Sequence, residues 1–188
     1  MIHLILLAAG SARRFGANKL MWPVNGRPMF MHTLQKLLDL REKHGWDVTL
    51  IAQEGPVAQA AQSLPVNVVI NPDHALGISS SIRRGIAALP DDGHSAAFFV
   101  ADQPWLTEAT AEAFLEAFMT SGKSCGCVAH SGETGNPAAF SRALFPELIA
   151  LEGDRGGKRV LMRHLDDCML YEVANARELA DIDTPQDC

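Results

Sequence analysis

Two patterns of apolar residues alternate along this chain, one typical of strands and the other typical of helices. The chain is therefore predicted to alternate between strands and helices. Short runs dominated by apolar residues are typical of strands buried on both faces of a parallel sheet. Longer segments, in which apolar residues recur every three or four positions, are typical of helices with one buried face. The predicted strands of the first two thirds are 4–7, 48–52, 66–70 and 96–101, and the predicted helices are 29–43, 56–63, 79–89 and 107–119.

The last third of the chain continues the same pattern. It predicts strands near 125–130, 136–140 and 168–173, and helices near 141–151 and 157–165. Strands that alternate with helices favour an α/β fold, and we expect a three-layer α/β/α, Rossmann-like arrangement with a mostly parallel sheet. With 188 residues, of which 47% are hydrophobic, the chain is long enough for one such core. We therefore predict a single domain over residues 1–188.

The segment after the first strand contains the most informative chemistry. Ala8, Ala9 and Gly10 lack bulk, so a ligand can approach the backbone N–H groups closely. Arg14 and Lys19, together with a neighbouring arginine, add cations, and guanidinium and ammonium groups both pair with phosphate. The segment therefore predicts a cradle for a polyphosphate, with a surface turn that contains incidental basic residues as the alternative.

Two widespread phosphate loops do not match this segment. The P-loop requires Gly-Lys-Ser or Gly-Lys-Thr at its end, and neither tripeptide occurs in the sequence. The dinucleotide-binding G-x-G-x-x-G also fails, because five residues separate Gly10 from Gly16.

Asp102 is the second candidate for chemistry. It follows the predicted buried strand 96–101, and open α/β sheets bind their ligands at this carboxyl edge. Magnesium prefers hard oxygen ligands, usually one or two carboxylates together with substrate phosphates, so Asp102 needs one partner. Asp181 and Asp183 are the candidates. The alternative for each of these residues is an ordinary turn or helix-capping role.

Composition excludes several classes of protein. The formal net charge of -6 argues against a general nucleic-acid binder. No apolar run approaches the roughly 20 residues of a membrane span, so we expect no membrane partner and a cytoplasmic location. Cysteines at 125, 127, 168 and 188 lack the paired C-x-x-C spacing, so we expect them to be buried as small apolar groups rather than to bind metal.

The first loop also carries a family resemblance. Leu7-Ala8-Ala9-Gly10-Ser11-x-x-Arg14-x-Gly16-x-x-Lys19 resembles the signature L-A-A/G-G-x-S/G-x-R-x-G-x-x-K of nucleotidyltransferases that activate sugars, polyols and molybdenum cofactor. The whole chain is similar to the MobA-like NTP transferase family, particularly its molybdenum cofactor cytidylyltransferase branch. Further similar segments are Gly77–Ile82, Ala101–Pro104, Gly135–Pro137, Gly153–Gly157 and Asp181–Pro185.

The resemblance implies a Mg²⁺-dependent transfer of a nucleoside monophosphate from an NTP to a molybdopterin-type cofactor, with release of pyrophosphate. It implies CTP, because Ala8-Ala9-Gly10 matches the cytidylyl branch. On this basis Arg14, Lys19 and Asp102 are the predicted catalytic residues, and Asp102 and Asp183 are the predicted metal ligands. The predicted nucleotide-binding residues, within a nucleotide-binding half 1–104, are Leu7, Ala8, Ala9, Gly10, Ser11, Arg14, Lys19, Gln53, Ser79, Ser80 and Asp102.

The acceptor is expected to bind in the half formed by residues 105–188. The residues that resemble the acceptor segments of this branch are Gly135, Asn136, Pro137, Asp154 and Lys158. A recipient molybdenum hydroxylase is an expected partner. Two alternatives stay open: a sugar- or polyol-phosphate nucleotidyltransferase, and a non-catalytic accessory protein that hands cofactor to a hydroxylase.

Overall fold

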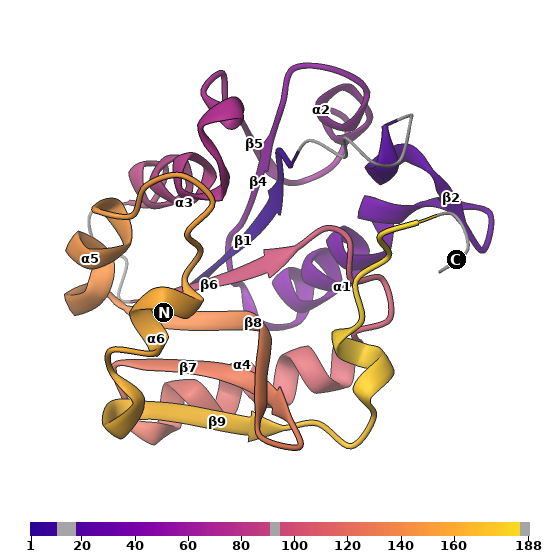
Figure 1. The fold of residues 1–188 in the computed structure, drawn as a ribbon. Helices are drawn as coiled ribbons and strands as arrows, with labels where there is room; N and C mark the ends of the chain where they lie inside the picture. Colours follow the sequence, from indigo (N-terminus) through magenta and orange to yellow (C-terminus); the bar gives the residue numbers. More distant parts are fainter. Residues whose placement is uncertain (11–17, 91–94, 185–188) are drawn as a thin grey trace.

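A seven-stranded sheet forms the centre of the protein in a computed structural model that describes residues 1–10, 18–90 and 95–184. Its strand order is β5-β4-β1-β6-β8-β7-β9 (Figure 1). The strands are β1 (Ile2–Ala8), β4 (Val48–Ala52), β5 (Asn67–Ile70), β6 (Ser95–Val100), β7 (Cys125–His130), β8 (Glu133–Ser141) and β9 (Cys168–Glu172). Two short strands, β2 (Pro23–Val24) and β3 (Arg27–Pro28), pair separately.

The central strands pair in parallel, as expected from their apolar runs. β1 lies between β4 and β6, and β4 pairs with β5. Leu4, Ile5 and Leu6 have no exposed surface, so β1 is buried on both faces. The carboxyl ends of β5, β4, β1 and β6 therefore lie along one edge of the sheet.

Helices cover both faces of the sheet (Figure 1). α1 (Met29–His44), α2 (Pro56–Ala61) and α4 (Glu108–Ser121) contribute to one apolar cluster, whereas α3 (Ile78–Ala87), α5 (Phe145–Ile149) and α6 (Lys158–Leu161) contribute to the other. The described residues also form short 3₁₀ helices, which are η1 (Lys19–Met21), η2 (His74–Leu76), η3 (Arg142–Leu144), η4 (Leu165–Asp167) and η5 (Ala176–Leu179). The predicted three-layer α/β/α fold with a mostly parallel sheet is confirmed.

The second part of the chain differs in detail from the sequence expectations. The strand expected near 136–140 extends over Glu133–Ser141 and runs antiparallel to both β6 and β7. The helix expected over 141–151 divides into η3 and α5, and the helix expected over 157–165 is limited to Lys158–Leu161. Pro146 in the first turn of α5 explains the division, because its fixed φ suits a helix start and it has no N–H to donate.

No helix among the described residues is both long and apolar enough to cross a membrane.

Candidate active site

A cavity of about 860 Å³ lies at the carboxyl edge of β1, β4 and β6. Side chains or backbone from the loop after β1, from η1, from the β5–α3 connection and from the C-terminal segment form its walls. The described lining residues are Leu7, Ala9, Gly10, Asn18, Lys19, Leu20, Gln53, His74, Ala75, Gly77, Ile78, Ser81, Val100, Ala101, Asp102, Asp154 and Asp183. The cavity therefore joins residues from both halves of the sequence.

Lys19 lies between the two predicted metal ligands. Its Nζ donates to Asp102 Oδ2 over 3.0 Å and to Asp183 Oδ1 over 3.2 Å. Burial alone would lower the pKa of Lys19, but the two carboxylates, Asp102 foremost, outweigh that effect and raise it above its ordinary value. The two carboxylates therefore favour the charged form of Lys19 at this end of the cavity. Residues separated by up to 164 positions in the sequence meet here.

Asp183 is positioned by the packing of the C-terminal segment against the loop after β6. Ile182 is fully buried, and its N–H donates to the carbonyl of Asp102 over 3.0 Å. The Gln103 side chain donates to the Leu179 carbonyl over 3.0 Å and to Asp181 Oδ1 over 2.9 Å. These bonds hold the segment in register with Asp102, so the two carboxylates face the same cation.

Asp181 lies beside this pair but differs from it electrostatically. Asp181 is exposed, and the partial desolvation of its carboxyl group together with the neighbouring Asp102 raises its pKa. Its hydrogen bond from Gln103 ties it to the loop after β6. This arrangement favours Asp183, as expected from the resemblance, as the residue that shares a ligand with Asp102.

Two side chains of α1 bind the loop that follows β6. Thr33 Oγ1 donates to the Gln103 carbonyl over 3.2 Å, and Lys36 Nζ donates to the Pro104 carbonyl over 2.7 Å. Partial burial lowers the pKa of Lys36. Asp102 is thus held on a loop whose two following carbonyls are both fixed by side chains.

The small residues after β1 form the floor of the cavity. Among the described residues, no heavy atom lies within 4 Å of the position that a Cβ on Gly10 would take. Gln53 follows β4, and its Nε2 donates to the carbonyls of Ala9, at 2.8 Å, and Gly10, at 3.3 Å. Gln53 therefore fixes this backbone, a role that the sequence did not indicate, while it also lines the cavity. Ser11 and Arg14 lie outside the described residues.

The serine-rich start of α3 has one member in the cavity. Ser81 lines it, whereas Ser79 and Ser80 are buried and are not among the lining residues. Ser80 Oγ donates to the Gly77 carbonyl over 2.8 Å and accepts from Asn71 Nδ2 over 2.9 Å. Ser79 and Ser80 as nucleotide ligands stay a prediction, and the structure places them behind the wall that Ser81 presents.

The acceptor residues expected from the sequence divide into two groups. Asp154 lines the cavity wall next to Gly77, where a Cβ would lie 2.4 Å from the Gly153 carbonyl and 2.6 Å from Asp154 Oδ1. The positive φ of Gly77 and this close approach both require glycine. Lys158 is exposed at the start of α6.

Gly135, Asn136 and Pro137 lie at the beginning of β8. Since Ala138 pairs with Phe98 in an antiparallel register, the residues that precede it point toward the edge at which β6 ends. A Cβ on Gly135 would contact Leu179 at 3.2 Å, so this strand packs on the segment that leads to Asp183. The three residues therefore flank the Asp102 side of the edge without lining the cavity itself.

A cluster of potential metal ligands elsewhere has a structural explanation. Among the described residues, His44, Glu112 and Glu116 place ligand atoms within 4.8 Å of one another, and none of them lines the cavity. Lys43 Nζ donates to Glu112 Oε2 over 2.8 Å, and His44 Nε2 lies 2.5 Å from Glu112 Oε1. These contacts tie the end of α1 to α4.

The cysteines of the sheet are thiols in apolar surroundings. Cys125 and Cys127 are fully buried on β7, and Cys168 is partly buried on the neighbouring strand β9. Burial, with Cys168 as the next contribution, raises the pKa of Cys125 and of Cys127 to about 12. The expectation that these residues pack as small apolar groups agrees with their burial.

Comparison with known proteins identifies the family. The model of the MobA-like NTP transferase domain matches residues 4–168, which include the loop after β1, Lys19 and Asp102. This chain belongs to the MobA-like NTP transferase family. The expected family is thereby confirmed, and the match covers most of the chain.

Two relatives match this MobA-like domain over very different lengths. The purine catabolism protein PucB of Bacillus subtilis is 28% identical over 97% of this chain and 92% of its own length. A probable molybdenum cofactor guanylyltransferase of Thermococcus sibiricus is 37% identical over a segment of 38 residues, 20% of each chain.

Solved structures share the fold of this MobA-like domain. Rv0371c of Mycobacterium tuberculosis aligns with a TM-score of 0.80 at 24% identity, covering 100% of this chain and 95% of its own. A second structure of Rv0371c, described as a complex with manganese, has a TM-score of 0.74 at 24% identity and covers 92% and 88%. A nucleotidyl transferase of Methanothermobacter has a TM-score of 0.82 at 23% identity and covers 100% and 94%.

Proposed function

We propose that this MobA-like protein transfers the nucleoside monophosphate of CTP to the phosphate of a molybdopterin-type cofactor and releases pyrophosphate. The observation that supports the chemistry most strongly is the Lys19 ammonium held between Asp102 and Asp183 at one end of a nucleotide-sized cavity. The reaction needs a cation at the transferred phosphoryl group and hard oxygen ligands for a metal beside it. This arrangement provides both.

The donor set fits a divalent metal ion such as Mg²⁺. Asp102 and Asp183 present carboxylate oxygens to one point, and the Lys19 ammonium lies there as a cation between them. We propose that Asp102 and Asp183 hold Mg²⁺ when nucleotide binds, since Mg²⁺ takes one or two carboxylates together with substrate phosphates. When bound, it supplies positive charge to the phosphate oxygens of the nucleotide.

Lys19 supplies the other positive charge. Because its pKa is raised, it stays protonated at neutral pH and can neutralise charge that develops on the α-phosphoryl oxygens. A phosphate oxygen of the acceptor attacks the α-phosphorus, and the bond from that phosphorus to the bridging oxygen of pyrophosphate breaks. The acceptor phosphate is already anionic, so its activation requires no side chain as general base. Positioning and charge stabilisation then account for most of the rate.

The choice of CTP and of the acceptor is supported by the sequence and by one relative. Ala8-Ala9-Gly10 matches the cytidylyl branch, and Ala9 lines the cavity next to Gly10, where we propose that its Cβ leaves room for the smaller pyrimidine base. The name of the Thermococcus relative supports a molybdenum cofactor as acceptor but names guanylyl transfer, so GTP is the competing nucleotide. The segment Gly135–Pro137 and residues Asp154 and Lys158 are the proposed acceptor contacts. The recipient hydroxylase stays a prediction.

Product analysis tests this proposal. The protein is incubated with Mg²⁺, a molybdopterin cofactor and each common ribonucleoside triphosphate in turn, and the dinucleotide is identified by mass spectrometry. We expect a cytidine product and pyrophosphate release that Lys19→Ala and Asp102→Ala reduce at least about a hundredfold, the loss typical of a removed charge-stabilising group. Lys43→Ala, whose ammonium pairs with Glu112 away from the cavity, is the matched control. Near wild-type turnover in the Lys19 or Asp102 variant contradicts its assigned role.

A further inference from the structure

The cavity has two chemically different ends. Lys19, Asp102 and Asp183 form the charged end, at the edges of β1 and β6. The opposite wall comes from the β5–α3 connection, and its residues are His74, Ala75, Gly77, Ile78 and Ser81. β5 lies two strands from β1, and strands are about 4.8 Å apart, so the two walls are separated by roughly 10 Å. That distance suits the sugar and base of a nucleotide whose phosphates occupy the charged end.

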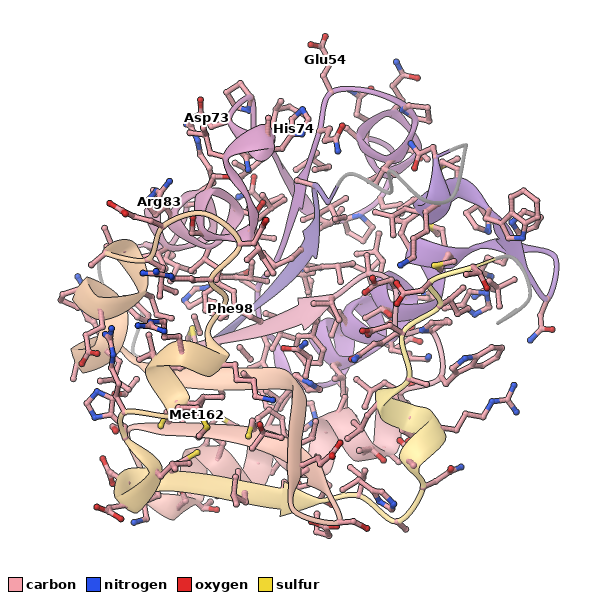
Figure 2. All side chains as sticks on the ribbon, in the orientation of Figure 1. Glu54, Asp73, His74, Arg83, Phe98 and Met162 are labelled. Carbon is pink, nitrogen blue, oxygen red and sulfur yellow. The ribbon has the colours of Figure 1, made fainter. Side chains whose placement is uncertain are left out.

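His74 is the side chain at this second end with unused hydrogen-bonding capacity. Its ring is half-buried and lines the cavity (Figure 2). Its Nδ1 atom is hidden from solvent and has no hydrogen-bond partner, and the described residues contain no partner for the other ring nitrogen either. A neutral imidazole offers one donor and one acceptor. Because Nδ1 is hidden, Nε2 is the ring nitrogen that a ligand in the cavity can reach, and among the described residues nothing competes with the ligand for it.

Three hydrogen bonds hold the turn that carries His74. Asp73 Oδ2 accepts from Arg84 Nη2 over 2.9 Å, and the Asp73 N–H donates to Asn71 Oδ1 over 3.0 Å. The Leu76 N–H donates to the Asp73 carbonyl over 2.9 Å, which closes the 3₁₀ turn. Figure 2 shows Asp73 and His74 side by side at this end of the molecule, above α3. These bonds fix the backbone that carries the imidazole.

Charge determines which part of a nucleotide belongs at this end. Asp154 Oδ1 lies beside Gly77, so the wall carries a carboxylate, and the described lining residues place no lysine or arginine there. A phosphate would be repelled, whereas a neutral, hydrogen-bonding ring would not. Ala75 and Ile78 add apolar surface suited to the flat face of such a ring.

We propose that His74 is a specificity-determining residue that hydrogen-bonds the nucleobase of the bound NTP. This inference rests on the proposed function, because it takes the cavity to be the NTP site. His74 then discriminates among nucleotides by the donor and acceptor pattern of the base edge, while Lys19 and Asp102 bind the phosphates that all NTPs share.

Binding calorimetry tests the inference without any acceptor. Wild type, His74→Ala, His74→Asn and His74→Gln are titrated with non-hydrolysable α,β-methylene analogues of CTP, GTP, ATP and UTP in the presence of Mg²⁺. His74→Asn places a polar nitrogen near the position of Nδ1, and His74→Gln places one near that of Nε2. Leu76→Ala, in the same turn but 61% exposed and not part of the cavity lining, is the matched control.

For wild type we expect a clear preference for one analogue. His74→Ala should weaken binding of the preferred analogue about tenfold, as expected for one lost hydrogen bond, and leave the affinities for the other analogues nearly unchanged. Either the Asn or the Gln variant should restore the preference in part, and Leu76→Ala should keep it. If His74→Ala retains the full preference, or lowers the affinity for all four analogues equally, His74 does not recognise the base. The cavity would then still bind NTP, and the proposed function would be unaffected. Absence of NTP binding in wild type overturns the proposed function itself.

Discussion

Replacing Asn71 by alanine should loosen the wall of the cavity and destabilise the fold. Asn71 is fully buried just after β5, and its side chain makes three hydrogen bonds. Nδ2 donates to Ser80 Oγ over 2.9 Å and to Ser81 Oγ over 3.0 Å, while Oδ1 accepts from the Asp73 N–H over 3.0 Å. Asn71 thus joins the end of β5 to the first turn of α3 and to the turn that carries His74.

The expected loss follows from these three bonds. At about 0.5–1.5 kcal/mol for each intramolecular hydrogen bond, Asn71→Ala should lower the free energy of unfolding by about 2–4 kcal/mol. For a domain of this size each kcal/mol corresponds to about 2–4 °C, so the melting temperature should fall by roughly 5–15 °C. NTP affinity should fall as well, because Ser81 and His74 lose their support.

Urea denaturation followed by tryptophan fluorescence measures the stability change, and calorimetry measures the NTP affinity. Asn67→Ala is the matched control, since Asn67 is exposed at the start of β5 and its amide lies 3.5 Å from Thr49 Oγ1. It should change the free energy of unfolding by less than about 0.5 kcal/mol. If Asn71→Ala lowered the free energy of unfolding no more than Asn67→Ala does, the three Asn71 hydrogen bonds would not stabilise the wall.

Two further predictions concern the cavity floor and the buried thiols. Gly10→Val should lower NTP affinity at least about tenfold, because the new side chain fills the space beside the backbone. It should change the melting temperature little, since no described atom lies near the Cβ position. Equal NTP affinity of the variant and wild type in calorimetry would contradict this prediction. Cys125 and Cys127, with pKa values of about 12, should resist iodoacetamide at mildly alkaline pH in the native protein and react once it is denatured, as mapped by peptide mass spectrometry. Rapid native alkylation of either thiol would show that β7 is not buried as described.

The strands and helices of the first half could be predicted closely, because each has its own apolar spacing. β4 matches the expected residues 48–52, and α1 extends the expected helix by one residue, to His44. The direction of β8 could not be predicted in this way. A nine-residue strand next to β7 has the same local pattern whether it pairs in parallel or antiparallel, and only packing against β6 and β7 fixes its direction.

Site residues could be predicted from the sequence where the residue type itself determines the chemistry. They could not be predicted where the role depends on contacts between distant parts of the chain. Lys19 and Asp102 were expected in one crevice, and their hydrogen bond places them there. The support that Gln53 gives to the backbone of residues 9 and 10 has no local signal, because it joins positions 44 apart. His74 has no local signal either, because only the fold brings it to the cavity.

The proposed reaction requires that a metal–nucleotide complex binds between Asp102, Asp183 and Lys19, and a Mn²⁺ titration measures this binding. Electron paramagnetic resonance follows free Mn²⁺ during titration of wild type and of Asp102→Asn, each with and without the α,β-methylene analogue of CTP. We predict that the analogue strengthens Mn²⁺ binding to wild type by at least about tenfold and that Asp102→Asn abolishes this gain. Equal nucleotide-dependent Mn²⁺ binding in the two proteins would show that Asp102 does not hold the metal.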